Sequence, residues 1–335
     1  MKFAVIGAGA IGGFLGARLA LAGEDVTFVA RGANLEAIRR NGFRLIEEDG
    51  TERLATSAKA RAIDEPGAYD VIFLAVKAQQ VAGLARDLSG LLGPETEVVT
   101  LQNGVPWWFF YKLGGPYEGR QIHVTDPDGV IAANIAPERI IGAVVYPAAE
   151  LTAPGVVKVV EGDRFTLGEP DGAKSDRVRA VSEALTRGGL KAPVSSDIRA
   201  EIWLKLWGNV AFNPVSALTH ATLADICRFP PTRALAAAMM AEAQVVAEKL
   251  GVRVRISIDR RIAGAGAVGA HKTSMLQDVE AGRPLELETL VGSVVELARL
   301  TETPTPAIDA VYACASLLAK TLGDADGRLA IAPRG

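Results

Sequence analysis

Three glycines near the N-terminus, Gly7, Gly9 and Gly12, have the spacing G-x-G-x-x-G. They follow an apolar strand pattern and open a helical one, the context in which this spacing binds a dinucleotide. There Gly7 makes a tight turn, Gly9 lets the backbone approach a pyrophosphate, and Gly12 lets the helix pack closely on the strand. Ala10 and Ile11 begin the helix, whose N–H groups and positive dipole favour phosphate. The alternative is a glycine turn in an α/β protein of another kind.

A basic residue follows the second strand pattern, at the place that discriminates between dinucleotides. The pattern at 26–30 ends in Ala30, and Arg31 comes next. A site that prefers NAD has an acidic side chain here, which accepts a hydrogen bond from the ribose 2′-hydroxyl. A guanidinium can instead pair with the 2′-phosphate of NADP through two hydrogen bonds. The cofactor is therefore predicted to be NADP(H), unless Arg31 is an ordinary solvated loop residue.

A polar stripe interrupts an apolar helical segment in the second half of the chain. Lys205, Asn209 and Asn213 recur at intervals of four residues, which places them on one face of a helix. The residues around them include Leu204 and Trp207. A lysine and two amides in such surroundings are costly to bury unless they line a polar cavity. The stripe therefore predicts a ligand site, the alternative being the solvated face of an amphipathic helix.

Polar residues also follow two other strand patterns. Lys77 comes after the apolar run at 69–76, and Asn103 after the run at 98–101. The carboxyl ends of parallel strands form the edge at which open α/β sheets bind ligands, so both residues are candidates for the site. Each is also typical of an ordinary loop, and Asn-Gly is a common turn.

An α/β framework must position these residues. Over the first 100 residues, strand and helix patterns alternate, which indicates a parallel sheet with right-handed crossovers. Beyond 197 the periodicity is nearly all helical, beginning with a helix at 199–212. We therefore expect an α/β domain that binds NADP over 1–196 and an all-α domain over 197–335. The smaller elements expected are a hairpin at 51–56, strands within 140–167, a helix at 175–187 and a last strand at 191–194.

Composition excludes several classes of protein. The 335 residues are 49% hydrophobic and 22% charged, which excludes intrinsic disorder, and a net charge of −3 is unlike that of a general nucleic-acid binder. No apolar run reaches the length of a membrane span, and the first residues have no signal-peptide pattern. Cys227 and Cys314 fit two buried thiols in a reducing compartment, so a cytoplasmic protein is expected. The three histidines have no metal-ligand spacing, and no metal is expected.

Over essentially its whole length the chain resembles the ketopantoate reductases (2-dehydropantoate 2-reductases). Two long segments carry most of the resemblance, and three short motifs at strand ends support it. They are IRAEIWLKLWGNVAFNPVSALT at 198–219, SMLQDVEAGRPLELE at 274–288, GAGAIG at 7–12, VKA at 76–78 and QNG at 102–104. The resemblance implies a Rossmann-type domain followed by an all-α C-terminal domain like that of 6-phosphogluconate dehydrogenase, and NADPH-dependent reduction of 2-dehydropantoate to pantoate in the biosynthesis of pantothenate and coenzyme A.

The resemblance also implies roles for single residues. Lys205 matches the general acid that protonates the substrate carbonyl oxygen, and Glu286 an active-site carboxylate beside it. Residues matching substrate contacts are Asn209 and Asn213, which meet its oxygens, Ser274, which binds its carboxylate, and Asn103, beside the lysine and the nicotinamide. Arg31 and Lys77 match basic contacts to NADPH. Burial lowers the pKa of a lysine and a nearby carboxylate raises it, and the sequence alone leaves open which effect dominates at Lys205.

Two departures from the family pattern bear on the substrate. Leu285 stands where a threonine is often found. Aromatic residues make up only 6% of the chain, yet five stand consecutively at 107–111, within a segment over 105–137 that is longer than usual. The cluster is a cap over the substrate, an interface or a hydrophobic plug. The alternatives for the whole protein are a reductase of another 2-oxo acid and a non-catalytic NADPH-binding sensor.

The expected partner is a small 2-oxo acid, with no nucleic acid and no membrane. A homodimer would have two candidate interfaces, the Ala-rich helix at 233–250 and the aromatic cluster at 107–111.

Overall fold

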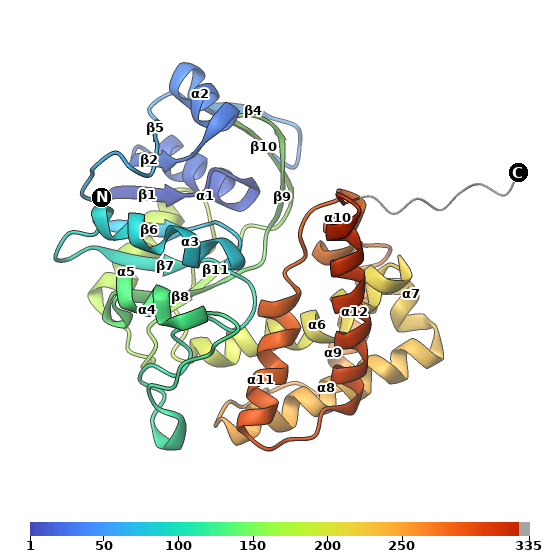
Figure 1. Ribbon diagram of the computed structural model, residues 1–335. Coiled ribbons are helices and arrows are strands. Elements are labelled where there is room, and N and C mark those ends of the chain that lie inside the picture. Colours follow the sequence, from blue (N-terminus) through green and yellow to red (C-terminus); the bar gives the residue numbers. More distant parts are fainter. Residues whose placement is uncertain (328–335) are drawn as a thin grey trace, which may run out of the picture. The chain divides into compact units, whose positions relative to one another are not determined.

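The computed structural model describes residues 1–327 and divides the chain into two compact units. The first unit runs from Met1 to Glu201, and the second begins at Ile202. The first is built on β-sheets, and the described residues of the second form helices and connecting loops (Figure 1). This is the α/β fold class with a helical C-terminal part that the sequence predicts.

The main sheet of the first unit has seven strands in the order β11-β8-β7-β6-β1-β2-β5. All neighbours are parallel except β11, which runs antiparallel to β8. The central strands are apolar runs because both faces of the sheet are covered. The strands are β1 (Lys2–Ile6), β2 (Asp25–Val29), β5 (Lys59–Arg61), β6 (Val71–Leu74), β7 (Glu97–Thr100), β8 (Ile140–Val145) and β11 (Phe165–Gly168).

The strand order reverses between β1 and β6, and such a point is where open α/β sheets bind their ligands. Helix α1 (Ala10–Leu21) follows β1 and packs against α5 (Asp176–Arg187). Helix α3 (Ala78–Leu88) follows β6 and packs against α4 (Val130–Asn134). The remaining α-helix that lies wholly within the first unit is α2 (Gly32–Asn41), which packs on β5. The α1 and α3 N-termini therefore belong to connections that leave neighbouring strands at the carboxyl edge.

A second, four-stranded sheet in the order β4-β3-β10-β9 packs on α1. Its strands are β3 (Phe43–Ile46), β4 (Glu52–Ala55), β9 (Ala148–Ala153) and β10 (Val156–Glu161). The antiparallel pair β3–β4 confirms the hairpin expected around 51–56. Phe43 of this sheet stacks on Phe28 of the main sheet with 4.7 Å between ring centroids, so both sheets share one apolar core.

The second unit is helical over its described residues. Helix α6 (Ile198–Thr219) begins within the first unit and supplies the first helix of the second. A short π-helix, Glu288–Gly292, runs directly into α11. The other helices are α7 (Leu223–Arg228), α8 (Pro230–Lys249), α9 (Ile258–Ala267), α10 (Ser274–Glu280), α11 (Ser293–Leu300) and α12 (Pro306–Asp324).

Three expectations about local structure are wrong. The last strand at 191–194 is only two isolated bridges, Arg164 to Lys191 and Leu167 to Val194. Helix α6 does not end at Phe212 but continues through Pro214, because the residues beyond the proline are buried and packing outweighs one lost backbone hydrogen bond. Cys227 is buried as expected, but Cys314 is exposed, because it lies on the outer face of α12.

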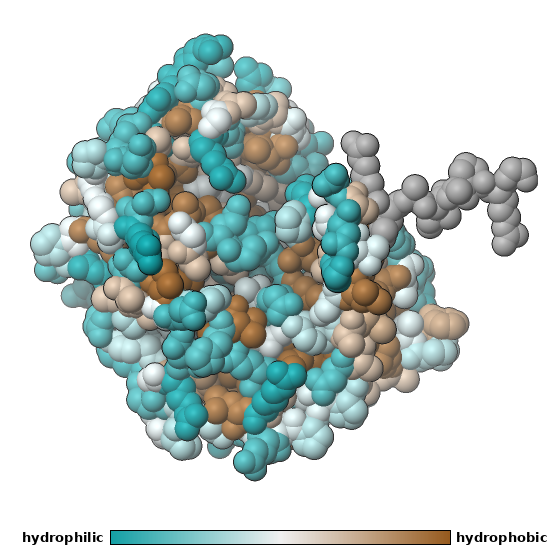
Figure 2. Space-filling view, in the orientation of Figure 1, coloured by the Kyte–Doolittle hydropathy of each residue, from teal (hydrophilic) through white to brown (hydrophobic). Residues whose placement is uncertain are grey.

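The surface in Figure 2 is largely hydrophilic, with apolar side chains in patches between polar ones. Among the residues that the structure describes, no helix combines the length and apolar character needed to cross a membrane.

Candidate active site

The glycine-rich turn after β1 has an open backbone. Gly7 has φ +100°, in the left-handed region, and its N–H donates to the carbonyl of Val29 over 3.0 Å. A Cβ on Gly12 would lie 2.0 Å from the carbonyl oxygen of Gly7, so only glycine allows α1 to start this close to the turn. A Cβ on Gly9 would meet no atom within 4 Å. The turn is therefore closed on its protein side and open on the side a ligand would take.

The N-terminus of α1 is suited to an anion. Its N-cap is Gly9, which has no side chain to accept from the first N–H groups, and the first turn holds no acidic residue. Ala10 and Ile11 form that turn and are partly buried. Unpaired N–H groups together with the helix dipole favour phosphate at such a place.

A cavity of about 570 Å³ lies at this edge of the sheet. Arg31, exposed at the N-cap of α2, is the one charged side chain in its lining, which contains no carboxylate. The lining consists of Ile6, Gly7, Ala8, Gly9, Val29, Ala30, Arg31, Asn34, Ile63, Val76, Gln80, Gly83 and Leu84. The cavity thus brings together two of the predicted glycines and Arg31, and its apolar walls suit a planar base while its charge suits an anion.

Asn34 is a lining residue that the sequence analysis missed. Its Nδ2 donates to the carbonyl of Ala8 over 2.6 Å, and its Oδ1 accepts from the N–H of Gly155 over 2.6 Å. The side chain therefore ties the glycine-rich turn to the β9–β10 turn of the second sheet. An asparagine just after a helix start gives no sequence signal for a partner 121 residues away.

Lys77 and Asn103 stand at the carboxyl edge but not in the lining of this cavity. Lys77 is the N-cap of α3, and its backbone N–H donates to Oε1 of Gln80 over 3.1 Å. Gln102, next to Asn103, donates from Nε2 to the carbonyls of Leu74 and Val76 over 2.8 and 3.0 Å. The loops after β6 and β7 are thus held together, and both candidates are partly buried.

The aromatic cluster at 107–111 is largely packed inside the first unit. Trp108 donates from Nε1 to Oγ1 of Thr100 over 3.1 Å, and a Cβ on Gly142 would lie 2.7 Å from its ring. Phe109 and Phe110 are fully buried and meet edge to face. The sequence left open whether this cluster caps the substrate, forms an interface or fills space as a hydrophobic plug. The contacts described here are those of a plug, because they are made within the first unit.

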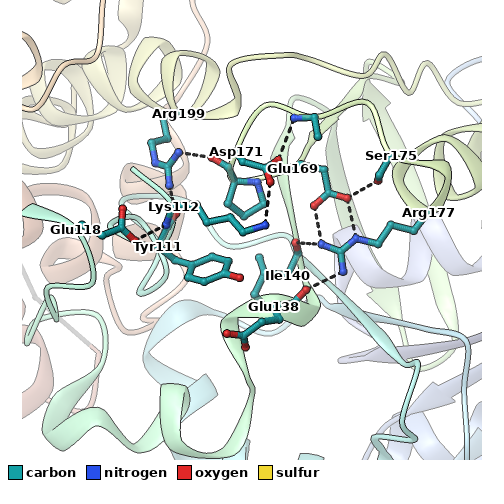
Figure 3. A network of polar contacts seen from close by, with 12 residues as sticks. Tyr111, Lys112, Glu118, Glu138, Ile140, Glu169, Asp171, Ser175, Arg177 and Arg199 are labelled. Atoms are coloured by element: carbon teal, nitrogen blue, oxygen red, sulfur yellow. Dashed lines mark hydrogen bonds and ion pairs between the residues drawn. The ribbon is translucent and has the colours of Figure 1, made fainter. Parts of the chain in front are cut away.

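Arg199, in the first turn of α6, forms hydrogen bonds with the backbone of this cluster (Figure 3). It is buried and donates to three backbone carbonyls, those of Phe109 over 2.7 Å, Tyr111 and Pro170. Its cation also lies over the ring of Phe109, 5.8 Å from the centroid. One side chain therefore fixes the start of α6 to the end of the aromatic segment.

A second cluster of polar contacts in Figure 3 connects α5 to the segments next to β8 and β11 at the end of the main sheet. The Arg177 guanidinium pairs with both carboxylate oxygens of buried Glu169 over 2.7 and 2.6 Å. It also donates to the carbonyls of Glu138 and Ile140. Glu97, at the start of β7, is close enough to this polar cluster for both of its charges to influence the Glu97 carboxyl group.

Glu97 is expected to destabilise the protein at alkaline pH. Its buried Oε2 has no hydrogen-bond partner, and burial raises its pKa to about 7, with Arg177 opposing and Glu169 reinforcing the shift. Since the folded state holds this proton above the unfolded pKa, the stabilisation is complete at acidic pH and is lost as the pH rises through 7. Glu97→Gln should therefore raise the free energy of unfolding at pH 8 by about 1 kcal/mol after solvent screening, with little effect at pH 5.

Denaturant unfolding at pH 5 and pH 8 measures this difference. Exposed Glu36, on α2 of the same unit, provides the control Glu36→Gln, which should change neither value. An equal effect of Glu97→Gln at both pH values would contradict the prediction.

The second unit contains five of the predicted site residues, Lys205, Asn209, Asn213, Ser274 and Glu286. Lys205 and Asn209 are partly buried on α6, and Asn213 is buried one turn further on. Asn213 Nδ2 lies 3.5 Å from Oγ of Ser274, the first residue of α10, so α10 meets the polar stripe there. The stripe is thus not a solvated face.

Lys205 has an altered acidity. Burial lowers its pKa to about 8, and the carboxylate of Glu286 opposes the shift. Glu286 is partly buried and lies two residues before the π-helix, and its carbonyl accepts from the N–H of Leu290 over 3.2 Å. π-Helices are rare and frequently mark functional sites. Of the two opposing effects, burial dominates, and the result is an ammonium that can release its proton near neutral pH.

Among residues 1–327, no group of three or more His, Cys, Asp and Glu side chains could hold a metal ion. The described side chains form a cavity with one positive charge in the first unit, and a lysine of lowered pKa on the same helix as two amides in the second.

Comparison with known proteins identifies the family to which the chain belongs. Residues 3–172 match the family model described as ketopantoate reductase PanE/ApbA, and residues 197–319 match that for its C-terminal part. The 2-dehydropantoate 2-reductase of Mesorhizobium japonicum is 55% identical over 324 residues, which are 96% of this chain and 99% of the relative.

Two solved structures are similar over nearly their full length. A candidate ketopantoate reductase from Ralstonia solanacearum MolK2 has a TM-score of 0.91 and 41% identity, covering 96% of this chain and 98% of that one. The 2-dehydropantoate 2-reductase of Methylococcus capsulatus has a TM-score of 0.81 and 28% identity, with the same coverage of 96% and 98%. This chain therefore belongs to the ketopantoate reductase family of oxidoreductases.

Proposed function

We propose that the protein catalyses the NADPH-dependent reduction of 2-dehydropantoate to pantoate. The observation that carries the proposal is Lys205, an ammonium whose pKa is lowered to about 8 on a stripe of amides. A binding protein without catalysis has no use for a tuned proton donor. The close similarity to the Mesorhizobium japonicum enzyme supports 2-dehydropantoate as the substrate.

The first unit fits NADPH. The side of Gly9 open to a ligand and the uncapped α1 N-terminus suit the pyrophosphate, with Gly7 and Gly12 shaping the turn. Arg31, with no carboxylate near it in the cavity lining, suits the 2′-phosphate. Lys77 and Asn103 would contact the cofactor from the loops after β6 and β7. When bound, NADPH supplies the hydride.

The second unit provides the proton and holds the substrate. Reduction of a ketone places negative charge on its oxygen, and the Lys205 ammonium stabilises that charge and donates its proton to the oxygen. Asn209 and Asn213 donate to the oxygens of the substrate, and Ser274 contacts its carboxylate. Glu286 keeps the pKa of Lys205 from falling further.

A panel of 2-oxo acids tests the proposal through the consumption of NADPH at 340 nm. Preferential turnover of 2-dehydropantoate supports it. Preferential turnover of another 2-oxo acid would show that the protein catalyses the same kind of reduction but has that acid as its substrate. Tight NADPH binding without any turnover would identify a sensor instead.

The rate of reduction should fall above pH 8. Lys205 must be protonated to act as an acid, so kcat is expected to drop about tenfold per pH unit once the pH exceeds its pKa of about 8. Since Glu286 raises that pKa, Glu286→Gln should move the alkaline limb of the profile to lower pH. Steady-state rates from pH 6 to pH 10 measure both effects.

Glu280→Gln, which removes the charge of an exposed glutamate of the same unit, is the control and should leave the limb in place. An alkaline limb that is unchanged in Glu286→Gln would show that Glu286 does not influence the pKa of Lys205.

A further inference from the structure

One peptide bond of the glycine-rich turn is held by an asparagine side chain. The Nδ2 group of Asn34 donates to the carbonyl oxygen of Ala8 over 2.6 Å. Asn34 is itself held, because its Oδ1 accepts from the N–H of Gly155 over 2.6 Å, and the carbonyl of Gly155 accepts from the N–H of Arg44 over 2.8 Å. Three successive hydrogen bonds therefore connect the second sheet to the glycine-rich turn.

The direction of this carbonyl determines the direction of the next N–H. The peptide bond between Ala8 and Gly9 is trans and planar, so its C=O and N–H groups point in opposite directions. Since the carbonyl of Ala8 is directed at Asn34, the N–H of Gly9 points away from Asn34. Among residues 1–327, no atom accepts a hydrogen bond from this N–H, and Gly9 lines the cavity. The N–H is thus available to a ligand in the cavity.

Without Asn34, this peptide bond would be easy to turn over. Gly9 has no Cβ, and one built on it would meet no atom within 4 Å, so little restricts the backbone torsion angles on that side. A rotation of the peptide unit would exchange the directions of its C=O and N–H groups. The hydrogen bond from Asn34 opposes that rotation in the free protein. A binding group that is already oriented loses less conformational freedom on association, and the affinity is higher for that reason.

We propose that Asn34 is a positioning residue for the cofactor, which orients the Ala8–Gly9 peptide bond so that the N–H of Gly9 donates to the pyrophosphate. The inference rests on the proposed function, since the pyrophosphate is that of NADPH. Arg31 lines the same cavity but is expected to bind the 2′-phosphate. Loss of the Asn34 amide should therefore weaken the binding of every ligand that has the pyrophosphate, and of none that has only the 2′-phosphate.

Calorimetric titration with ADP and with adenosine 2′-monophosphate separates the two roles. ADP has the pyrophosphate without a 2′-phosphate, and adenosine 2′-monophosphate has the reverse. Asn34→Ala should weaken the binding of ADP, NADH and NADPH by about 5- to 10-fold each, the equivalent of one neutral hydrogen bond, and leave adenosine 2′-monophosphate unaffected. Arg31→Ala should weaken adenosine 2′-monophosphate and retain ADP. Asn41→Ala removes an exposed amide of the same helix, outside the cavity lining, and is the matched control that should bind all four ligands as wild type does.

Two results of this titration would overturn the inference. One is an unchanged affinity for ADP in Asn34→Ala. The other is an equal loss for ADP and adenosine 2′-monophosphate, because it would show that Asn34 supports the cavity as a whole and does not act on the pyrophosphate.

An NMR measurement on wild type makes the test independent of how Asn34→Ala folds. Labelling the carbonyl carbon of alanine and the nitrogen of glycine restricts the spectrum to glycines that follow an alanine, among them Gly9. The Gly9 amide proton should shift downfield with ADP and not with adenosine 2′-monophosphate, because a hydrogen bond to phosphate deshields it. Absence of an ADP-specific shift would overturn the inference. Wild type that shows the shift but reduces no 2-oxo acid with NADPH would support the inference and contradict the proposed function.

Discussion

Lys205→Ala is expected to lower kcat for the reduction of 2-dehydropantoate by about 10²–10⁴-fold, the usual contribution of a positioned general acid. The lysine contributes both a proton and a positive charge at the oxygen on which charge develops. Its own unit holds no part of the NADPH cavity, so the affinity for NADPH should be unchanged. Steady-state kinetics together with calorimetric titration of NADPH measures the two quantities separately.

Two further measurements distinguish proton donation from a structural role. Added methylamine should restore part of the rate in Lys205→Ala, because a soluble ammonium can replace the missing one. Lys320→Ala, which removes an exposed lysine of α12, should behave as wild type. Turnover near the wild-type rate in Lys205→Ala would remove this residue from the mechanism.

Arg31→Ala should weaken NADPH binding about 10- to 100-fold and leave NADH binding unchanged. The two cofactors differ only in the 2′-phosphate, and Arg31 is the one charged side chain lining the cavity. The magnitude is that of a lost hydrogen bond between charged partners. Arg31→Glu should go further and favour NADH, because a carboxylate repels the phosphate and accepts from the ribose hydroxyl.

Titration of each variant with NADPH and NADH measures the preference. Arg40→Ala is the matched control, since Arg40 is an exposed arginine of the same helix, outside the cavity lining. Equal losses of affinity for NADPH and NADH in Arg31→Ala would show that the guanidinium supports the loop and does not bind the 2′-phosphate.

Local patterns made much of this site predictable. The glycine spacing is interpretable because it stands between a strand and a helix, and the Lys205 stripe because four-residue intervals define a helix face. Lining residues such as Asn34, Ile63 and Gln80 could not be predicted, because they come from separate segments that only the tertiary fold brings together.

Other features depend on packing in three dimensions. The direction of the Lys205 pKa shift needed the balance between burial and Glu286, which no spacing reveals. Pro214 would end a helix in isolation, but buried neighbours carry α6 past it to Thr219.

The two hydrogen bonds of Asn34 have a consequence for protein engineering. Nucleotide-binding halves of α/β sheets are attractive as transplantable modules, and here residues up to Val145 supply β1, β2, β5, β6, β7 and β8. The Oδ1 of Asn34, however, accepts from Gly155, which lies beyond that cut. A minimal cofactor-binding fragment would have to retain the β9–β10 hairpin, since without it the amide that holds the glycine-rich turn loses one of its two anchors.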